Sequence, residues 1–188
     1  DILSVMYSCG FPILAEISAI AFGARALGID LKSKFSFTGV SGKDIAGGTA
    51  ASFFGQTAAA FLISMLSLLF ADKAQDIVQS AITAKTSLAA NIIMYTYVCL
   101  LGPVIEEILF RGIILESMRQ YNERFAIVFS SLIFGLMHCN IPQAVNGFIV
   151  GLVLGALYVR SRSLIPSSAV HIIMNTVTSL LSVMLYSD

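Results

Sequence analysis

Six apolar stretches follow one another along the chain, and short polar segments separate them. A helix that crosses the hydrocarbon core of a bilayer needs about 20 apolar residues, and most of these stretches approach or exceed that length. The pattern therefore predicts an all-α fold, a polytopic bundle of about six transmembrane helices. The predicted helices are Ile2–Leu27, Ile45–Phe70, Leu88–Leu115, Phe125–His138, Gln143–Val159 and Pro166–Tyr186.

The connector between the first two helices, residues 28–44 with the sequence GIDLKSKFSFTGVSGKD, mixes polar and apolar positions. It can lie along the membrane surface as an interfacial helix or form a plain loop, and both interpretations remain open. Basic residues in short loops favour the cytoplasmic side, so the connector is placed there. Arg25, Lys32, Lys34, Lys43, Arg119, Arg124, Arg160 and Arg162 then lie inside, whereas Lys73 and Lys85 lie outside.

Composition supports a membrane protein and excludes one class of partner. Hydrophobic residues make up 57% of the chain and charged residues 12%, with a mean hydropathy of +0.87. A soluble domain would carry about a quarter charged residues. Eleven basic and eleven acidic side chains leave no charge excess for nucleic acid. Since the chain opens on Asp1 rather than Met, we expect further residues, with or without another helix, to precede it in the natural protein.

Small residues recur at every fourth position in two predicted helices. Such stripes let helix backbones approach closely in lipid, so they predict packing faces within the bundle. The stripes are Gly47, Ala51, Gly55 and Ala59 in the second helix, and Gly147, Gly151 and Gly155 in the fifth.

Charged side chains inside the third helix are the main anomaly of the pattern. The stretch GPVIEEILFRGI places Glu106, Glu107 and Arg111 in an apolar run. A carboxylate at the centre of a membrane helix costs at least about 2.5 kcal/mol, so each one needs a partner, a water-filled cavity or a function. Glu107 and Arg111 are four residues apart and can form an ion pair. Glu106 points about 100° away and has no partner on its own helix.

The two histidines of the chain lie in the later membrane helices, and an asparagine accompanies one of them. His171 and Asn175 are four residues apart, so they project from one helix face. Glu106 and His138 each lie sixteen residues from Asn122, the middle of the turn between their helices, and should sit at similar depth. We expect the four polar groups to converge in the half of the membrane that faces the cytoplasm.

This set of side chains can activate water. Glu106 is the candidate general base, and His138 can hold the same water. His171 and Asn175 can donate hydrogen bonds to the oxyanion that forms when water attacks an amide carbonyl. A zinc ion bound by Glu106, His138 and His171, with water as its fourth ligand, is the competing chemistry. Spacing does not separate the two mechanisms.

The three cysteines, Cys9, Cys99 and Cys139, are odd in number and lie in or beside apolar helices, so we expect no disulfide. A cysteine protease that uses Cys139 is disfavoured. Cys139 directly follows His138, and successive helical residues diverge by about 100°.

Three motifs carry a family resemblance. EEILFR (106–111), FGLMH (134–138) and HIIMN (171–175) match, in order, the EExxxR, FxxxH and HxxxN motifs of the CPBP family. This family comprises the intramembrane CAAX-type proteases and bacteriocin-processing enzymes, and is also called the Abi family. The match covers roughly the C-terminal half of the chain. We therefore divide the single membrane domain into N-terminal helices and connectors, residues 1–87, and a CPBP-like helical core, residues 88–188.

The resemblance implies an intramembrane endopeptidase. By its motifs, Glu106 activates water with help from His138, His171 and Asn175 stabilise the oxyanion, and Glu107 and Arg111 occupy the remaining motif positions. Family members cleave prenylated CAAX proteins, process bacteriocin or signalling-peptide precursors, or support immunity to bacteriocins. The compact chain is more similar to the bacterial branch, which implies the bacterial plasma membrane and a peptide or lipidated protein substrate. We favour the mechanism without a metal and leave the oligomeric state open.

Two other classes of function remain as alternatives. A catalytically silent membrane scaffold or immunity protein could keep the polar cluster to hold its helices together. A transporter could use intramembrane carboxylates and histidines as a proton relay. The sequence shows no inverted repeat and no matching pair of broken helices, which disfavours the transporter.

Overall fold

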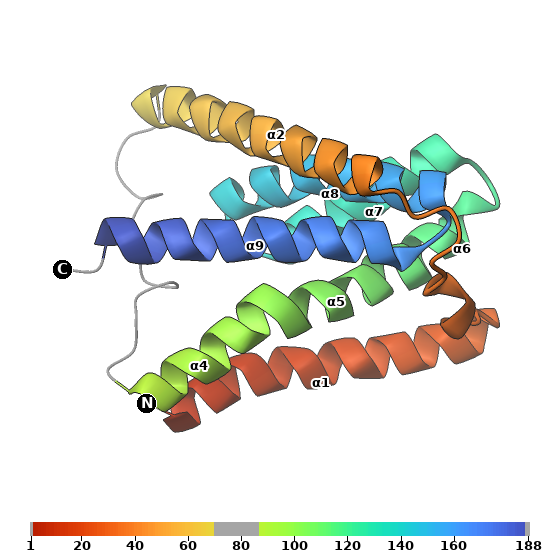
Figure 1. The fold of residues 1–188 in the computed structure, drawn as a ribbon, viewed down its shortest axis with the longest axis horizontal. Helices are drawn as coiled ribbons and strands as arrows, with labels where there is room; N and C mark the ends of the chain where they lie inside the picture. Colours follow the sequence, from red (N-terminus) through yellow and green to blue (C-terminus); the bar gives the residue numbers. More distant parts are fainter. Residues whose placement is uncertain (1, 70–86, 187–188) are drawn as a thin grey trace.

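The computed structural model describes residues 2–69 and 87–186, and these residues form a bundle of helices without strands (Figure 1). This confirms the predicted all-α transmembrane bundle. Three described helices are long and apolar enough by themselves to cross a membrane: Ile2–Leu27, Ile141–Ser161 and Leu164–Met184. The helices of the bundle are α1 (Ile2–Leu27), α2 (Gly42–Leu69), a long run over residues 88–119, α7 (Glu123–Leu136), α8 (Ile141–Ser161) and α9 (Leu164–Tyr186).

Most predicted helix bounds are correct to within three residues, and the differences have a local cause. Asn122 and Asn140 precede α7 and α8, and their side chains accept hydrogen bonds from the backbone N–H groups of Phe125 and Gln143. Such caps start a helix in a polar first turn, and a helix start read from the apolar residues alone therefore falls too late in the chain. His138, predicted to end the fourth helix, lies just beyond α7. The predicted end of the second helix, Phe70, lies outside the described residues.

The third helix is a single bent run with two π-helical segments (Figure 1). Its parts are α4 (Leu88–Thr96), η2 (Tyr97–Leu101), α5 (Gly102–Glu107), η3 (Ile108–Leu115) and α6 (Glu116–Arg119). The π-helical segments η2 and η3 were not predicted. They lie on either side of the six residues that end in the two glutamates, and π-helical turns occur frequently at functional sites.

Helix α8 packs against α2, α7 and α9, and its stripe of small residues is the contact with α7. Gly147 lies against Gly135, and Gly151 lies against Ser131. The predicted packing face of α8 is therefore confirmed.

The predicted packing face of α2 is only half correct. Gly55 and Ala59 lie on it, but Gly47 and Ala51 are exposed. Gly48 and Ser52, which are both buried, lie on the packing face instead. A spacing of four residues drifts by about 40° per step around a helix of 3.6 residues per turn, so the three steps from Gly47 to Ala59 cannot stay on one face.

One end of the bundle, here called the loop end, carries the connector 28–41 and the turns between α6 and α7 and between α8 and α9 (Figure 1). The connector contains only a short 3₁₀ turn, η1 (Lys32–Lys34). The predicted placement of these three loops on one side of the membrane agrees with this arrangement. Which side of the membrane the loop end faces stays a prediction.

Glu116 joins the loops at this end. Its carboxylate accepts hydrogen bonds from Lys34 Nζ at 2.7 Å, Arg119 Nη2 at 2.9 Å and the Tyr158 hydroxyl at 2.9 Å. Burial alone would raise the pKa of Glu116, but the hydrogen bonds from Lys34 and Tyr158 and the charges of Lys34 and Arg119 outweigh it and lower this pKa. The connector is thus tied to the end of the third helix and to α8.

The close contact between α7 and α8 leads to a stability prediction at Gly135. A Cβ atom there would collide with the backbone of Ala144 and Phe148. We expect Gly135→Ala to destabilise the protein by about 1–3 kcal/mol, because the two helix backbones must separate. Thermal unfolding in detergent measures this. Gly47→Ala is the control, since a Cβ at Gly47 meets no atom within 4 Å; equal melting temperatures for the two variants would contradict the prediction.

Candidate active site

A fully buried ion pair lies at the centre of the candidate site. Arg111 Nη1 donates to Glu107 Oε1 at 2.8 Å, and neither side chain is exposed. Arg111 Nη2 donates to the backbone carbonyl of Gly151 on α8 at 3.1 Å. The guanidinium also lies 4.7 Å from the centre of the Phe134 ring on α7. The predicted pair is therefore confirmed, and it connects the third helix to α7 and α8.

The ring of His171, on α9, lies between the two glutamates. Its Nδ1 is 3.1 Å from Glu107 Oε1, and its Nε2 is 3.6 Å from Glu106 Oε2. The carboxylate of Glu107, paired with Arg111, can only accept hydrogen bonds, so Nδ1 of His171 must donate. Glu106 has no partner on its own helix, as predicted. The side chain that lies beside it is His171 of α9.

The two glutamates differ in accessibility. Glu107 is completely buried, whereas 15% of the Glu106 side chain is exposed. Only Glu106 can therefore meet water or a substrate without a rearrangement of the helices.

His138 is held by its own helix. Its Nδ1 lies 3.0 Å from the carbonyl oxygen of Phe134, which can only accept, so Nδ1 donates. In the neutral imidazole this leaves Nε2 as a hydrogen-bond acceptor. The Phe134 ring meets both histidines edge-on, with centroid distances of 5.4 Å to His138 and 5.5 Å to His171. Phe134 therefore contacts both imidazoles and Arg111, and the sequence analysis assigned no role to its ring.

Asn175 lies one turn beyond His171 on α9 and faces η2. Its Nδ2 donates to the carbonyl oxygen of Val98 at 3.0 Å, and the Cys99 thiol lies against the carbonyl of Asn175. An amide nitrogen carries two hydrogens, so one remains for another acceptor. The structure thus brings Glu106, Glu107, Arg111 and His171 into one contiguous group, with His138 joined to it through Phe134 and Asn175 on the adjacent turn.

The zinc alternative requires at least three protein ligands around one point. Among residues 2–69 and 87–186, no group of three or more His, Cys, Asp or Glu side chains is arranged to hold a metal ion. Both nitrogens of His171 face carboxylates, and Nδ1 of His138 faces a backbone carbonyl. Glu106, His138 and His171 are thus not gathered as a three-ligand metal site in the described part of the chain, and the choice between zinc and a mechanism without a metal stays a prediction.

Sequence reasoning overlooked a further carboxylate, Glu16 on α1. Cys9, Glu16 and Gly23 recur every seven residues on the face of α1 that packs on the third helix, where Cys9 joins a buried cluster with Ala90 and Met94. Glu16 interacts electrostatically with Glu106, and one of its oxygens is buried with no hydrogen-bond partner among the described residues. Its signal in the sequence was visible: it is the single acidic residue in a 26-residue apolar helix.

Cys139 lies outside this group. It follows α7 with a positive φ of 56°, and its thiol contacts the carbonyl of Met137 at 3.5 Å. All three cysteines are free. The structure therefore offers no support for a nucleophilic Cys139.

Comparison with known proteins places this geometry in a family context. Residues 88–177 match the family described as "Type II CAAX prenyl endopeptidase Rce1-like". Over 78 residues, 41% of this chain, the sequence is 33% identical to the protein named "Putative membrane peptidase YdiL" of Bacillus subtilis (strain 168). The chain spans about a third of the length of that relative, 32%. No solved structure matches. The resemblance to the CAAX-type membrane peptidases that the three motifs predicted is confirmed, and its match covers residues 88–177, which contain all six candidate site residues.

Proposed function

We propose that this protein is an intramembrane endopeptidase that hydrolyses a peptide bond with a water molecule activated by Glu106. The observation that carries the proposal is the position of His171, held between the accessible Glu106 and the buried Glu107–Arg111 pair. A purely structural ion pair would need no histidine between it and a second, partly exposed carboxylate. The similarity to CAAX-type membrane peptidases supports the same reaction class.

The residues suggest the following division of roles. A water molecule donates one hydrogen bond to Glu106 and the other to Nε2 of His138, and its oxygen attacks the carbonyl carbon of the substrate. Glu106 takes the proton of this water. His171 and Asn175 donate to the oxyanion that forms. When the C–N bond breaks, Glu106 returns the proton to the leaving amine.

The geometry places one requirement on His171. Its Nδ1 hydrogen already points at Glu107. Donation to an oxyanion from Nε2 therefore requires the doubly protonated imidazolium.

The surroundings of Asn175 favour a membrane-associated substrate, which we propose to be a peptide or lipidated protein. A cavity of about 530 Å³ adjoins Asn175 between the third helix and α9. Its lining is mostly apolar and consists of Tyr95, Thr96, Cys99, Leu100, Thr176, Ser179, Leu180 and Val183. An apolar segment of the substrate can occupy this cavity while its scissile bond reaches Glu106. The similarity to a Bacillus subtilis membrane peptidase supports a bacterial plasma membrane, and the basic loops support placing this site in its cytoplasmic half.

The central test is cleavage of a library of lipidated and leader-type peptides by the purified protein in detergent, with and without a metal chelator. Glu106→Gln should reduce the rate at least about a hundredfold, since it removes the general base. Glu123→Gln, an exposed site at the loop end, is the matched control and should keep full activity. We expect the chelator to have no effect. If no peptide is cleaved and Glu106→Gln still protects cells from a bacteriocin, the scaffold alternative replaces the enzyme.

Asn175 provides a test of oxyanion stabilisation. Loss of one such donor typically slows turnover by about a hundred- to a thousandfold, and the effect is confined to the transition state. Asn175→Ala should therefore lower kcat by that order and leave KM nearly unchanged. Asn175→Asp should be as slow or slower, because it adds negative charge beside the oxyanion. A large rise in KM with unchanged kcat would assign Asn175 to substrate binding instead.

Arg111 is expected to matter for folding before it matters for catalysis. Arg111→Ala leaves the buried carboxylate of Glu107 without its cation, and loss of one partner of a buried pair typically costs about 3–5 kcal/mol. The variant should melt early or express poorly. The double variant Glu107→Gln/Arg111→Met should regain stability more than activity. A stable but inactive Arg111→Ala would show that the arginine acts on the substrate.

A further inference from the structure

The loop end carries a surplus of positive charge. Over residues 25–44, 116–124 and 160–162 the chain has eight basic and four acidic side chains. The acidic residues are Asp30, Asp44, Glu116 and Glu123. The surplus is concentrated at one end of a protein whose net charge is zero.

Half of the basic side chains at the loop end already form ion pairs, with three carboxylates between them. Glu116 forms ion pairs with Lys34 and Arg119. Asp44 Oδ1 lies 3.2 Å from Arg160 Nη2, and Glu123 Oε1 lies 2.6 Å from Arg162 Nη2. These pairs fasten the loops to one another.

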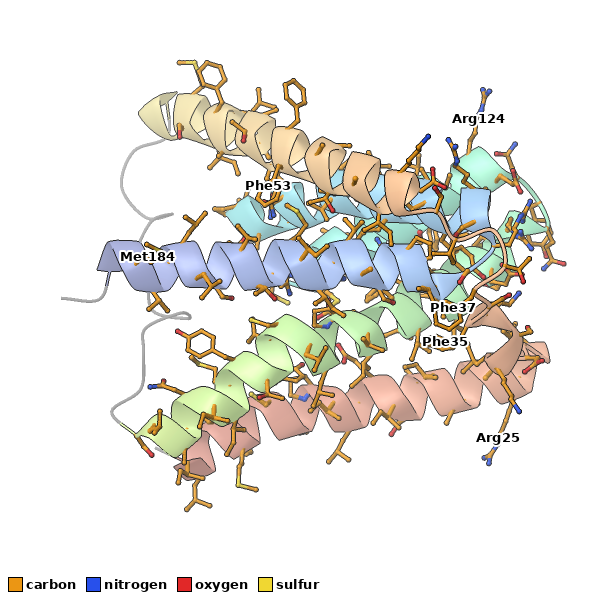
Figure 2. All side chains as sticks on the ribbon, viewed as in Figure 1. Arg25, Phe35, Phe37, Phe53, Arg124 and Met184 are labelled. Carbon is orange, nitrogen blue, oxygen red and sulfur yellow. The ribbon has the colours of Figure 1, made fainter. Side chains whose placement is uncertain are left out.

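The other half form a separate set, here called the free cations: Arg25, Lys32, Lys43 and Arg124. All four are exposed, and none forms an ion pair with any residue of the described chain. They come from the end of α1, from η1 and from the first turns of α2 and α7, so they surround the loop end. Figure 2 shows Arg25 and Arg124 projecting from opposite sides of the bundle at this end.

Exposed aromatic side chains occur beside the free cations. Phe37 is 81% exposed and Tyr121 is 75% exposed, and Phe35 and Phe125 are also exposed. Aromatic rings are enriched where a membrane protein passes from hydrocarbon to headgroups, and basic residues just beyond them meet the lipid phosphates. The two kinds of side chain therefore place the loop end at the level of the headgroups.

We propose that the loop end binds anionic phospholipid headgroups through Arg25, Lys32, Lys43 and Arg124. A phosphatidylglycerol headgroup carries a net negative charge that a phosphatidylcholine headgroup lacks. Guanidinium and ammonium groups donate several hydrogen bonds to a phosphate, and these four have no protein carboxylate to satisfy them. The lipid phosphates thus pair with these four cations, as the carboxylates of Glu116, Asp44 and Glu123 pair with the other four.

The test measures lipid selectivity directly. The full chain, purified in detergent, is mixed with equimolar phosphatidylglycerol and phosphatidylcholine, and bound lipids are counted by native mass spectrometry. Each basic residue at an anionic surface contributes roughly fivefold to binding, so the protein should prefer phosphatidylglycerol by at least about tenfold. The variant Arg25→Gln/Lys32→Gln/Lys43→Gln/Arg124→Gln should bind the two lipids nearly equally.

A matched control separates the free cations from general charge effects. Asp44→Asn/Glu123→Gln/Arg160→Gln/Arg162→Gln also changes four residues in the same loops but leaves the net charge unaltered, and it should keep the preference. If the first variant does not fold, the wild-type preference is measured at rising salt. It should vanish near about 1 M, where the screening length is only about 3 Å. Equal binding of both lipids by the wild type, or a preference that survives the four substitutions or high salt, would overturn the proposal.

Discussion

The cost of an unpaired charge inside a bilayer determines how this site is built. Glu107 cannot be left alone in the bundle, so Arg111 neutralises it, and Arg111 in turn needs acceptors for its other donors. It finds them on two other helices, at the carbonyl of Gly151 and the ring of Phe134. From a third helix, His171 Nδ1 donates to the same oxygen of Glu107, Oε1. The interactions that make the carboxylate tolerable in lipid are thus the same ones that orient the proposed catalytic histidine.

Much of the fold could be predicted from the sequence because lipid imposes long apolar helices. Most helix bounds differed by a few residues, and at the starts of α7 and α8 the cause is visible: Asn122 and Asn140 cap these helices and start them in a polar turn. The π-helical segments η2 and η3 were not predictable. A π-helical turn bonds residue i to i+5 instead of i+4, and over five to eight residues this does not change the spacing of apolar residues enough to be recognised. The face of α2 was misplaced because a four-residue repeat only approximates the helical turn.

For the site, contacts within one helix were predictable and contacts between helices were not. The Glu107–Arg111 pair followed from a spacing of four residues. That His171 would contact both glutamates depends on the rotation of α9 against the third helix, which no spacing reveals. Glu16 is a different case. The cost of a carboxylate in lipid, applied to Glu106, applies equally to Glu16 and would have identified it.

Because Arg111 donates to the carbonyl of Gly151, a substitution at this glycine can disturb the site although glycine contributes no side chain to it. A Cβ at Gly151 would lie 3.0 Å from the Cβ of Ser131, so any larger residue pushes α8 away from α7 and carries the carbonyl with it. Arg111 would then lose an acceptor, and the orientation of Glu107 and His171 would change. Loss-of-function alleles should therefore arise on α8, a helix that contributes no candidate catalytic side chain, as well as at the motif residues themselves.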